Sequence, residues 1–315
     1  MLDSPGHASA MSPFERYIAS GASRHGFWRV ILGMVIIGAF WVGGTMAVLS
    51  SWRALNTLLY GSLGARARLD ALIAGGSPGT VAIMLLTFAG IWVGVFLVVR
   101  LLHRQRFMTL FAPEGGIRMK DLAKGFVLAA GFALASIPIA LAIAAPVITN
   151  LPLHEWFGFS LLLLVLVFIQ ATAEELIFRG YLLQQLALRS RNPLIWAVLP
   201  AAAFGALHWT NAPTDQLSFY YASATFLIGI ALAALVWKTG SLWAATGVHV
   251  GFNIIGLSFA GTDGLFSGSQ LLLFPESALL PLMRLDLAVT ALMLAFILSP
   301  LAPFGPAERE AFQKN

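Results

Sequence analysis

The 315-residue chain has no cysteine and few charged residues, and each shortage narrows the class of protein. Without cysteine, disulfides, thiol catalysis and cysteine-ligated zinc or iron–sulfur sites are excluded. Charged residues make up only 10% of the chain, whereas a soluble domain has about 25%. Hydrophobic residues make up 58%. This composition excludes an ordinary soluble domain, a disordered chain and a fibrous repeat, and it predicts a polytopic membrane protein.

Long apolar runs predict about eight transmembrane helices, since a run of about 18 or more residues can cross the bilayer. The predicted spans are 30–50, 80–99, 125–147, 156–188, 193–208, 217–237, 241–257 and 287–302. The stretch 51–79 between the first two spans is rich in Gly, Ala and Arg. It is predicted to be an external loop with some amphipathic character. The expected fold class is therefore all-α.

The predicted spans divide the chain into four parts. We expect a cytoplasmic N-terminal segment over 1–29 and the first three transmembrane helices over 30–150. A catalytic core with helices four to seven is expected over 151–260. An external loop, the last transmembrane helix and a cytoplasmic tail are expected over 261–315.

The distribution of Lys and Arg predicts the orientation in the membrane. The net charge of +5 could suggest nucleic acid, but the basic residues lie mostly between spans, where topology explains them more simply. Fourteen of them fall on the side that would hold both termini and four on the other side. Positive residues favour the cytoplasmic side. We therefore expect a multi-pass protein of a bacterial cytoplasmic membrane, with both termini in the cytoplasm and no nucleic-acid partner.

Several polar residues lie inside the predicted spans, where a charge costs roughly 3 kcal/mol by insertion scales. They are Glu174, Glu175 and Arg179 in the fourth span, His208 in the fifth, and His249 and Asn253 in the seventh. From the helical rise, Glu174, His208, His249 and Asn253 lie about 15–22 Å below the cytoplasmic surface. Because three separate spans carry them at a similar depth, we expect one polar cluster inside the bundle.

The spacing of these residues predicts a division of labour. Glu175 and Arg179 are four residues apart with the acid first, the better order for a salt bridge along a helix. Glu174 has no such partner on its own helix, and His208 is a candidate across the bundle. A glutamate and a histidine can together activate water. His249 and Asn253 share a helix face, and their N–H groups can hold the oxyanion of a tetrahedral intermediate.

Three motifs in this order resemble those of the CPBP intramembrane glutamic endopeptidases. This family comprises the type II CAAX prenyl endopeptidases and the Abi self-immunity proteins. The motifs are Glu174-Glu175-x-x-x-Arg179, Phe204-x-x-x-His208 and His249-x-x-x-Asn253, and the stretch from Lys238 to Trp243 resembles the family's lead-in. The resemblance covers 159–255, under a third of the chain.

The resemblance implies an eight-helix membrane fold with a conical catalytic cavity inside the membrane. It implies a glutamate-dependent endopeptidase that needs no metal or other cofactor. Carried over to this chain, Glu174 activates water with His208, while His249 and Asn253 stabilise the oxyanion. Glu175 and Arg179 match the remaining charged positions of the motif. The implied partner is a peptide or protein at or in the membrane, either prenylated and CAAX-like or a bacteriocin or leader peptide.

The sequence also allows other interpretations of these polar residues. Glu174, His208 and His249 could supply a His2Glu zinc set, although no His-Glu-x-x-His motif is present. Intramembrane acids also mark ion pathways, but no inverted repeats favour a transporter. A non-catalytic immunity or partner-binding scaffold could keep the fold and all six residues. The acids could also form a structural ion network, and the His249/Asn253 pair an ordinary interhelical contact.

Overall fold

The computed structural model describes residues 11–22, 24, 26–262 and 266–304. Within those ranges six helical segments are long and apolar enough to cross a membrane. The prediction of an all-α polytopic membrane protein is confirmed, whereas the number of eight spans is not. Residues 1–10 and 305–315, in the predicted cytoplasmic segments, lie outside the described residues. So do residues 263–265 of the predicted external loop.

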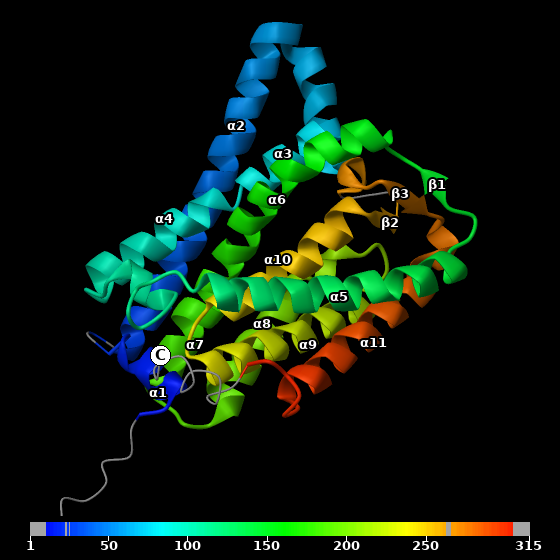
Figure 1. The fold of residues 1–315 in the computed structure, drawn as a ribbon. Coiled ribbons are helices and arrows are strands. Elements are labelled where there is room, and N and C mark those ends of the chain that lie inside the picture. Colours follow the sequence, from blue (N-terminus) through cyan, green and yellow to red (C-terminus); the bar gives the residue numbers. More distant parts are fainter. Residues whose placement is uncertain (1–10, 23, 25, 263–265, 305–315) are drawn as a thin grey trace, which may run out of the picture.

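The helices follow one another through the chain with short connections (Figure 1). The first half contains α1 (Pro13–Ala19), α2 (Phe27–Ala74), α3 (Pro78–Leu86), α4 (Ala89–Leu97), η1 (Val98–Leu102), η2 (Phe107–Leu110) and α5 (Met119–Ile143). The second half contains α6 (Leu153–Glu175), η3 (Leu176–Leu182), α7 (Leu183–Ala187), η4 (Leu194–Val198), α8 (Leu199–Leu207), η5 (Trp209–Asn211), α9 (Asp215–Thr239), α10 (Trp243–Ser258), η6 (Ser267–Ser269), η7 (Glu276–Ala278) and α11 (Leu279–Leu298).

Two of the eight predicted spans are short helices. The predicted span 193–208 corresponds to η4 followed by α8, of 5 and 9 residues. The predicted span 241–257 corresponds to α10, of 16 residues. Both are shorter than the roughly 20 residues that cross a bilayer as one helix. Helix α10 carries His249 and Asn253, and His208 directly follows α8, so three of the six candidate site residues lie on or next to these short helices.

The prediction of an external loop over 51–79 is wrong for most of that stretch, because α2 continues as a helix to Ala74. Leu, Ala and Arg are frequent in the helical part of this stretch, residues 51–74, and all three are strong helix formers. The helix is broken at Gly61, where φ is 71° and ψ is 174°. Glycine adopts a positive φ without a steric penalty. Figure 1 shows α2 projecting beyond the rest of the bundle before the chain turns back toward α3.

A small three-stranded sheet closes one end of the bundle. Its strands are β1 (Ile148–Thr149), β2 (Ala260–Thr262) and β3 (Leu272–Phe274), in the order β1-β3-β2. The central strand β3 pairs with β1 antiparallel and with β2 parallel. The sheet joins the connection before α6 to the connections after α10, so it ties together the ends of two helices that carry site residues.

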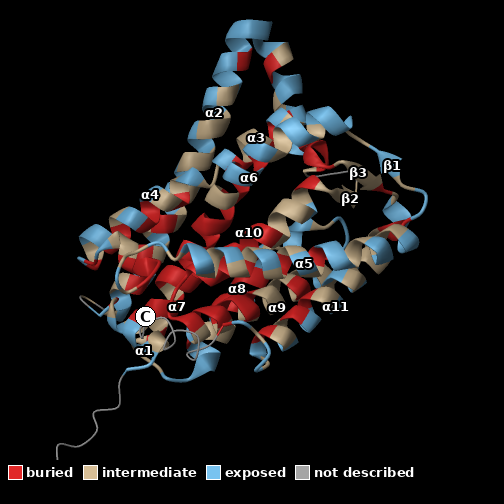
Figure 2. Ribbon diagram, in the orientation of Figure 1, coloured by how far each residue is buried: buried red, intermediate tan, exposed pale blue. Residues whose placement is uncertain are grey.

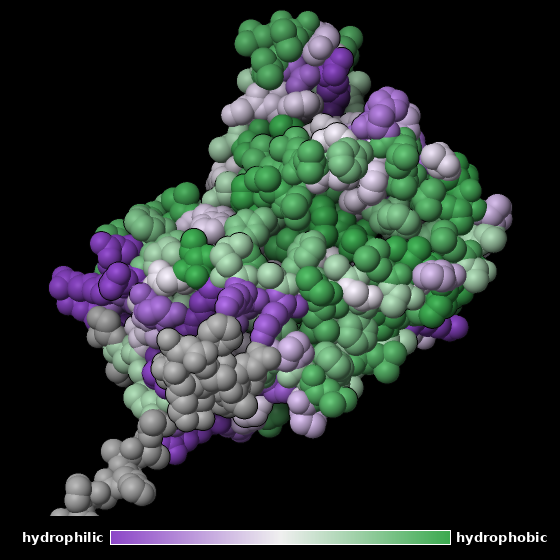
Figure 3. All heavy atoms as spheres, in the orientation of Figure 1, coloured by the Kyte–Doolittle hydropathy of each residue, from purple (hydrophilic) through white to green (hydrophobic). Residues whose placement is uncertain are grey.

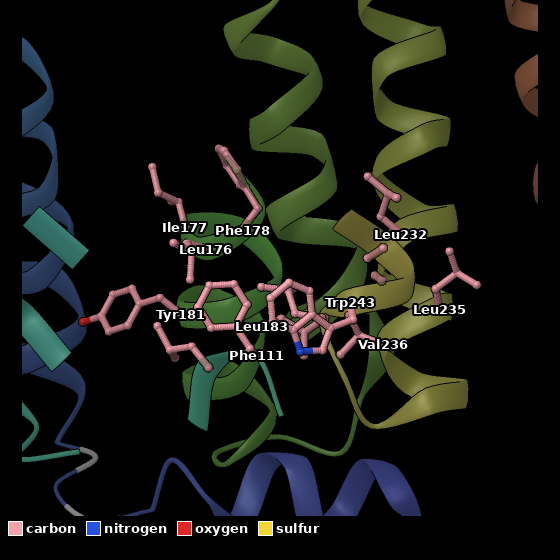
Figure 4. Close-up of a cluster of buried hydrophobic side chains, with 14 of the residues drawn as sticks. Phe111, Leu176, Ile177, Phe178, Tyr181, Leu183, Leu232, Leu235, Val236 and Trp243 are labelled. Atoms are coloured by element: carbon pink, nitrogen blue, oxygen red, sulfur yellow. The ribbon is translucent and has the colours of Figure 1, made fainter. Parts of the chain in front are cut away.

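The apolar core surrounds the second half of the predicted span 156–188, which corresponds to α6, η3 and α7. Figure 2 shows the buried residues concentrated on α6, α7 and α10, while the outer helices are largely exposed. In Figure 4 the rings of Phe111 and Trp243 lie between side chains of η3 and side chains of α9. These two rings stack with centroids 4.8 Å apart. Exposed apolar side chains cover most of the face seen in Figure 3, as expected of a surface that meets lipid.

The two described ends of the chain lie near each other. Ser12, Pro13 and Phe14, at the start of α1, line one cavity together with Ser299 and Phe304, which follow α11. The Lys238 ammonium donates to the carbonyl of Ser299 at 3.0 Å, at the end of α11. This proximity is compatible with the expectation that both termini lie on the same side of the membrane.

Candidate active site

Glu174 and Glu175 lie at the end of α6, in the best-buried part of the bundle. Glu174 is 8% exposed and Glu175 is fully buried. Directly after them the chain passes into η3, a π-helical segment. Single π-helical turns inside α-helices are often found at functional sites. The two acids are therefore placed at a local irregularity of a long apolar helix.

The salt bridge expected from the spacing of Glu175 and Arg179 is present. Arg179 Nη1 donates to Glu175 Oε1 at 2.8 Å, and both side chains are inaccessible to solvent. The Arg179 guanidinium also lies over the ring of Phe204, 4.5 Å from its centroid. A buried ion pair is stable only when its geometry and further hydrogen bonds offset desolvation. Here the second hydrogen bond to Glu175 comes from another helix.

Helix α10 turns one face to α5 and the opposite face to the acids of α6. A Cβ at Gly247 would come within 2.1 Å of the Leu122 carbonyl oxygen, and one at Gly251 within 2.8 Å of the Phe126 carbonyl. Glycine therefore permits the close approach of α10 to α5. His249 lies midway between the two glycines, about 200° round the helix from Gly247. Its imidazole consequently points toward α6.

The imidazole of His249 contacts both adjacent acids. Its Nδ1 lies 2.8 Å from Glu175 Oε1, and its Nε2 lies 3.4 Å from Glu174 Oε2. An ionised carboxylate can only accept hydrogen bonds, so Nδ1 carries the proton that is donated to Glu175. The other ring nitrogen, Nε2, faces Glu174. His249 thus occupies the position across the bundle from Glu174 that the sequence analysis assigned to His208.

His208 lies beside this cluster, at the end of α8. Its Nδ1 lies 2.8 Å from the carbonyl oxygen of Phe204, which can only accept, so Nδ1 carries a proton. The imidazole is flanked by the rings of Phe204 and Tyr221, with centroids 4.7 Å and 6.0 Å away. Within the described residues, His208 makes no hydrogen bond or ion pair with Glu174.

Asn253 lies one turn beyond His249 on α10 and binds a residue that the sequence analysis missed. Its Nδ2 donates to Oε1 of Gln170 at 3.0 Å. Gln170 is buried on α6, one turn before Glu174. A glutamine inside an apolar span, four residues from an acid, was the signal that could have identified it. Gln170, Glu174 and the partners on α10 thus form a polar strip between the two helices.

Phe204 joins the separate parts of the site. Its ring centroid is 5.0 Å from that of Phe178, 4.7 Å from that of His208 and 5.9 Å from that of His249. The ring therefore contacts both imidazoles, and the Arg179 guanidinium lies over its face. All of these are packing or cation–π contacts.

Several buried polar atoms of the site have no hydrogen-bond partner in the described part of the chain. They are Glu174 Oε2, Glu175 Oε2, Arg179 Nη2, Thr172 Oγ1 and Thr246 Oγ1. Buried polar atoms without partners each cost about 1–3 kcal/mol, so unpaired groups in a native site call for a functional reason. Glu174 Oε2 is of particular interest because it also faces His249 Nε2.

The zinc set considered from the sequence is not assembled. Among the described residues, no group of three or more His, Asp or Glu side chains is arranged so that it could hold a metal ion. Glu174 and His249 are close together, whereas His208 binds the backbone of its own helix. The described side chains therefore form a carboxylate–imidazole cluster rather than a ligand set.

The fold and the cluster define a multi-pass membrane protein with acidic and imidazole groups gathered between helices. Residues 156–255 match the family model described as Rce1-like: Type II CAAX prenyl endopeptidase Rce1-like. This segment contains all six residues picked from the sequence, and the resemblance inferred from their motifs is confirmed over it.

Among curated proteins the chain is similar to the "Uncharacterized protein YyaK" of Bacillus subtilis (strain 168). The two are 29% identical over 166 residues, which cover 51% of this chain and 54% of YyaK. The chain therefore spans about half the length of this curated relative. No solved structure matches the chain.

Proposed function

We propose that this protein is an intramembrane endopeptidase that hydrolyses a peptide bond of a membrane-associated substrate, with Glu174 as the catalytic carboxylate. The observation that carries the proposal is the unequal environment of the two adjacent acids. Glu175 Oε1 accepts two short hydrogen bonds, whereas within the described residues Glu174 Oε2 accepts none and only approaches His249 Nε2, at 3.4 Å. Glu174 is thus the acid that is free to take a proton from water. The match to the Rce1-like family supports the same class of reaction.

The protons of the cluster support a paired role for Glu174 and His249. Two carboxylates and the Arg179 guanidinium leave one negative charge, which a single further proton cancels. A neutral cluster is the least costly to bury. Because Nδ1 of His249 already carries a proton, the further proton resides either on His249 Nε2 or on Glu174, whose Oε2 lies 3.4 Å from that nitrogen. The pair can therefore accept and return one proton during a reaction.

In the proposed reaction, a carboxylate oxygen of Glu174 removes a proton from water while the water oxygen attacks the scissile carbonyl carbon. Glu174 then gives this proton back, and His208 passes it through Nε2 to the leaving nitrogen, while the Phe204 carbonyl holds the His208 Nδ1–H. The peptide C–N bond then breaks, and the amine leaves with the proton. General acid–base groups of this kind contribute about 10²–10⁴-fold to a rate.

In the same proposal, side chains of α10 stabilise the oxyanion of the tetrahedral intermediate. Asn253 has two N–H donors on its amide, and one of them is donated to Gln170. The second N–H and the Nε2–H of protonated His249 are the donors for the developing oxyanion. Removing one donor of this kind from an enzyme typically costs about 10²–10³-fold in kcat.

The proposed peptidase activity is tested by comparing the membrane peptides of cells with and without the Glu174 carboxylate. Cells that express the wild-type protein or Glu174→Gln would be analysed by mass spectrometry of membrane-extracted peptides. A product present with wild type and absent with Glu174→Gln is expected, and it would also identify the substrate as prenylated or not. Purified protein in liposomes, assayed on that peptide with and without a chelator, separates this mechanism from a zinc-dependent one. Loss of activity with the chelator and its return with zinc would overturn the metal-independent mechanism.

A non-catalytic scaffold is the second candidate, because the charged network is also well suited to stabilising the bundle. Arg179, Glu175 and His249 bind one another without any need for substrate. If the biological effect of the protein persists unchanged in Glu174→Gln and no peptide disappears, binding rather than catalysis is its role.

We further place the protein in the bacterial cytoplasmic membrane, with both termini in the cytoplasm.

A further inference from the structure

The segment that precedes α2 is attached to the helix that carries the acids by a row of hydrogen bonds. Gln184 Nε2 donates to the Tyr17 carbonyl at 2.8 Å, and Gln185 Nε2 donates to the Gly21 carbonyl at 3.3 Å. The hydroxyl of Tyr181 lies 3.2 Å from the carbonyl oxygen of Arg29, in the first turn of α2. The spacing of the donors places them on one face of the η3–α7 stretch. This whole face is thus used to hold backbone from the N-terminal segment.

Tyr17, in the middle of α1, extends the attachment toward the site. Its side chain is fully buried. The hydroxyl donates to the carbonyl of Leu110 at 2.6 Å and to that of Arg179 at 3.2 Å. A tyrosine hydroxyl has a single proton, so that proton is shared between the two carbonyls. Tyr17 therefore joins α1, η2 and η3 at one point.

The Arg179 carbonyl belongs to the π-helical turn that follows the two acids. The hydrogen-bond pattern of a π-helix is rare and occurs mostly as single turns, so this turn needs support from outside the helix. Gly180, the next residue, has no Cβ, and one placed there would lie 3.6 Å from the Cβ of Leu110. The close approach of η2 at this point brings the two acceptors of Tyr17 together.

We propose that Tyr17 is a positioning residue of the candidate active site. By binding the Arg179 carbonyl, its hydroxyl holds the turn from which the Arg179 side chain reaches Glu175. Glu175 in turn holds Nδ1 of His249, whose Nε2 faces Glu174. The inference rests on the proposed function for its effect on activity, but the predicted displacement of His249 does not depend on any substrate.

A positioning role differs from simple packing in what the hydroxyl does. Tyr17→Phe keeps the buried ring and removes only the O–H group. If Tyr17 serves packing alone, that variant keeps the geometry of the site. If the hydroxyl positions the π-helical turn, the site changes while the fold remains. Displacement of about 1 Å by a remote mutation can cost about 100-fold in rate.

The experiment compares wild type, Tyr17→Phe and the matched control Tyr60→Phe as full-length protein in detergent or liposomes. Tyr60 is exposed on α2, where its ring contacts Arg68. One readout is the NMR signal of the His249 Nδ1–H in protein with ¹⁵N-labelled histidine, assigned by its loss in His249→Gln. The other is the kinetics on the substrate peptide, as kcat, KM and the pH dependence of kcat.

We expect Tyr17→Phe to shift or broaden the His249 Nδ1–H signal and to lower kcat about tenfold or more, with little change in KM. The acid side of its pH profile should also move, because Glu175 and Arg179 determine the charge around His249. Tyr60→Phe should match wild type in every readout. An unchanged His249 signal in a folded Tyr17→Phe protein overturns the positioning role. A shifted signal without peptidase activity in wild type supports the positioning role and counts against the proposed function instead.

Discussion

Glu174 and Glu175 are adjacent in the chain but contact opposite nitrogens of the same imidazole. Glu175 Oε1 lies 2.8 Å from Nδ1 of His249, and Glu174 Oε2 lies 3.4 Å from Nε2. Glu175 also binds Arg179, while Glu174 Oε2 has no hydrogen-bond partner among the described residues. Adjacent side chains on a helix point about 100° apart. One acid can therefore be neutralised within the core while the other faces Nε2 of the imidazole.

Replacing Glu174 by Gln is expected to lower kcat by about 10²–10⁴-fold, because the amide cannot take a proton from water. The melting temperature in detergent should fall by less than in Glu175→Ala, since among the described residues Glu174 Oε2 has no hydrogen-bond partner and only a 3.4 Å contact with His249 Nε2. Glu155→Gln is the matched control, since Glu155 is exposed at the start of the same helix. Wild-type turnover by Glu174→Gln would contradict the assignment.

Glu175→Ala is expected to reduce the stability of the protein more than any other single change at the site. It leaves the buried Arg179 guanidinium without its salt bridge, and breaking a buried pair typically costs about 3–5 kcal/mol. The double variant Glu175→Leu/Arg179→Met removes both charges and should lose clearly less. Thermal unfolding in detergent measures both. An unchanged melting temperature in Glu175→Ala would show that the pair has no structural role.

A methyl group at position 229 is expected to disturb the same ion pair from the side of α9. The Cβ of Gly229→Ala would lie 3.0 Å from Arg179 Nη2 and 2.8 Å from the Cβ of Ala201. Overpacking of this kind costs about 1–3 kcal/mol. Gly131→Ala is the control, because a Cβ there meets nothing within 4 Å and should be neutral or stabilising by up to about 1 kcal/mol. Equal melting temperatures for the two variants would count against the close contact.

Asn253→Ala is expected to lower kcat more than it changes KM, because an oxyanion donor acts mainly in the transition state. Removing one donor typically costs about 10²–10³-fold in kcat. Gln170→Leu keeps Asn253 but removes the acceptor of its Nδ2–H, so it should give a smaller loss in the same direction. Steady-state kinetics on the substrate peptide distinguish the cases. An Asn253→Ala variant altered only in KM would argue for a role in substrate binding.

His103, at the end of the second span, is expected to make stability depend on pH. Burial lowers the pKa of His103, which lies between the carbonyl of Arg24 and the hydroxyl of Tyr181. The unfolded chain therefore binds a proton below a pH of about 6.5, where the folded protein still holds the ring neutral. Stability should fall as the pH drops from about 6.5 to the folded pKa and be unaffected above it.

Melting temperatures between pH 8 and pH 5 measure this dependence. His103→Asn, which does not titrate, should be less stable near pH 7 but should lose less stability on acidification than wild type. Identical slopes for the two proteins would assign the pH dependence to other groups.

How far the fold could be predicted differs between its parts. The apolar runs predicted the all-α membrane fold because hydrocarbon requires about 20 apolar residues for each crossing. The helix ends were less predictable, since α2 continues for more than twenty residues beyond the predicted end of the first span. Local composition indicated a loop there, but a helix broken at Gly61 satisfies the same backbone hydrogen bonds. The sequence predicts full spans at the two short helices because the residues that flank them are also apolar.

The sequence by itself determined which side chains take part in the candidate site, because charged and polar groups are costly inside a membrane and stand out among apolar residues. It also determined the Glu175–Arg179 pair, since helical spacing alone brings residues four apart together. Only the tertiary structure decided that His249 rather than His208 contacts Glu174, that Gln170 binds Asn253 and that Tyr17 reaches the turn of Arg179. Such contacts depend on the rotation and close approach of separate helices. Those are set by packing at positions such as Gly247, which no helical periodicity reveals.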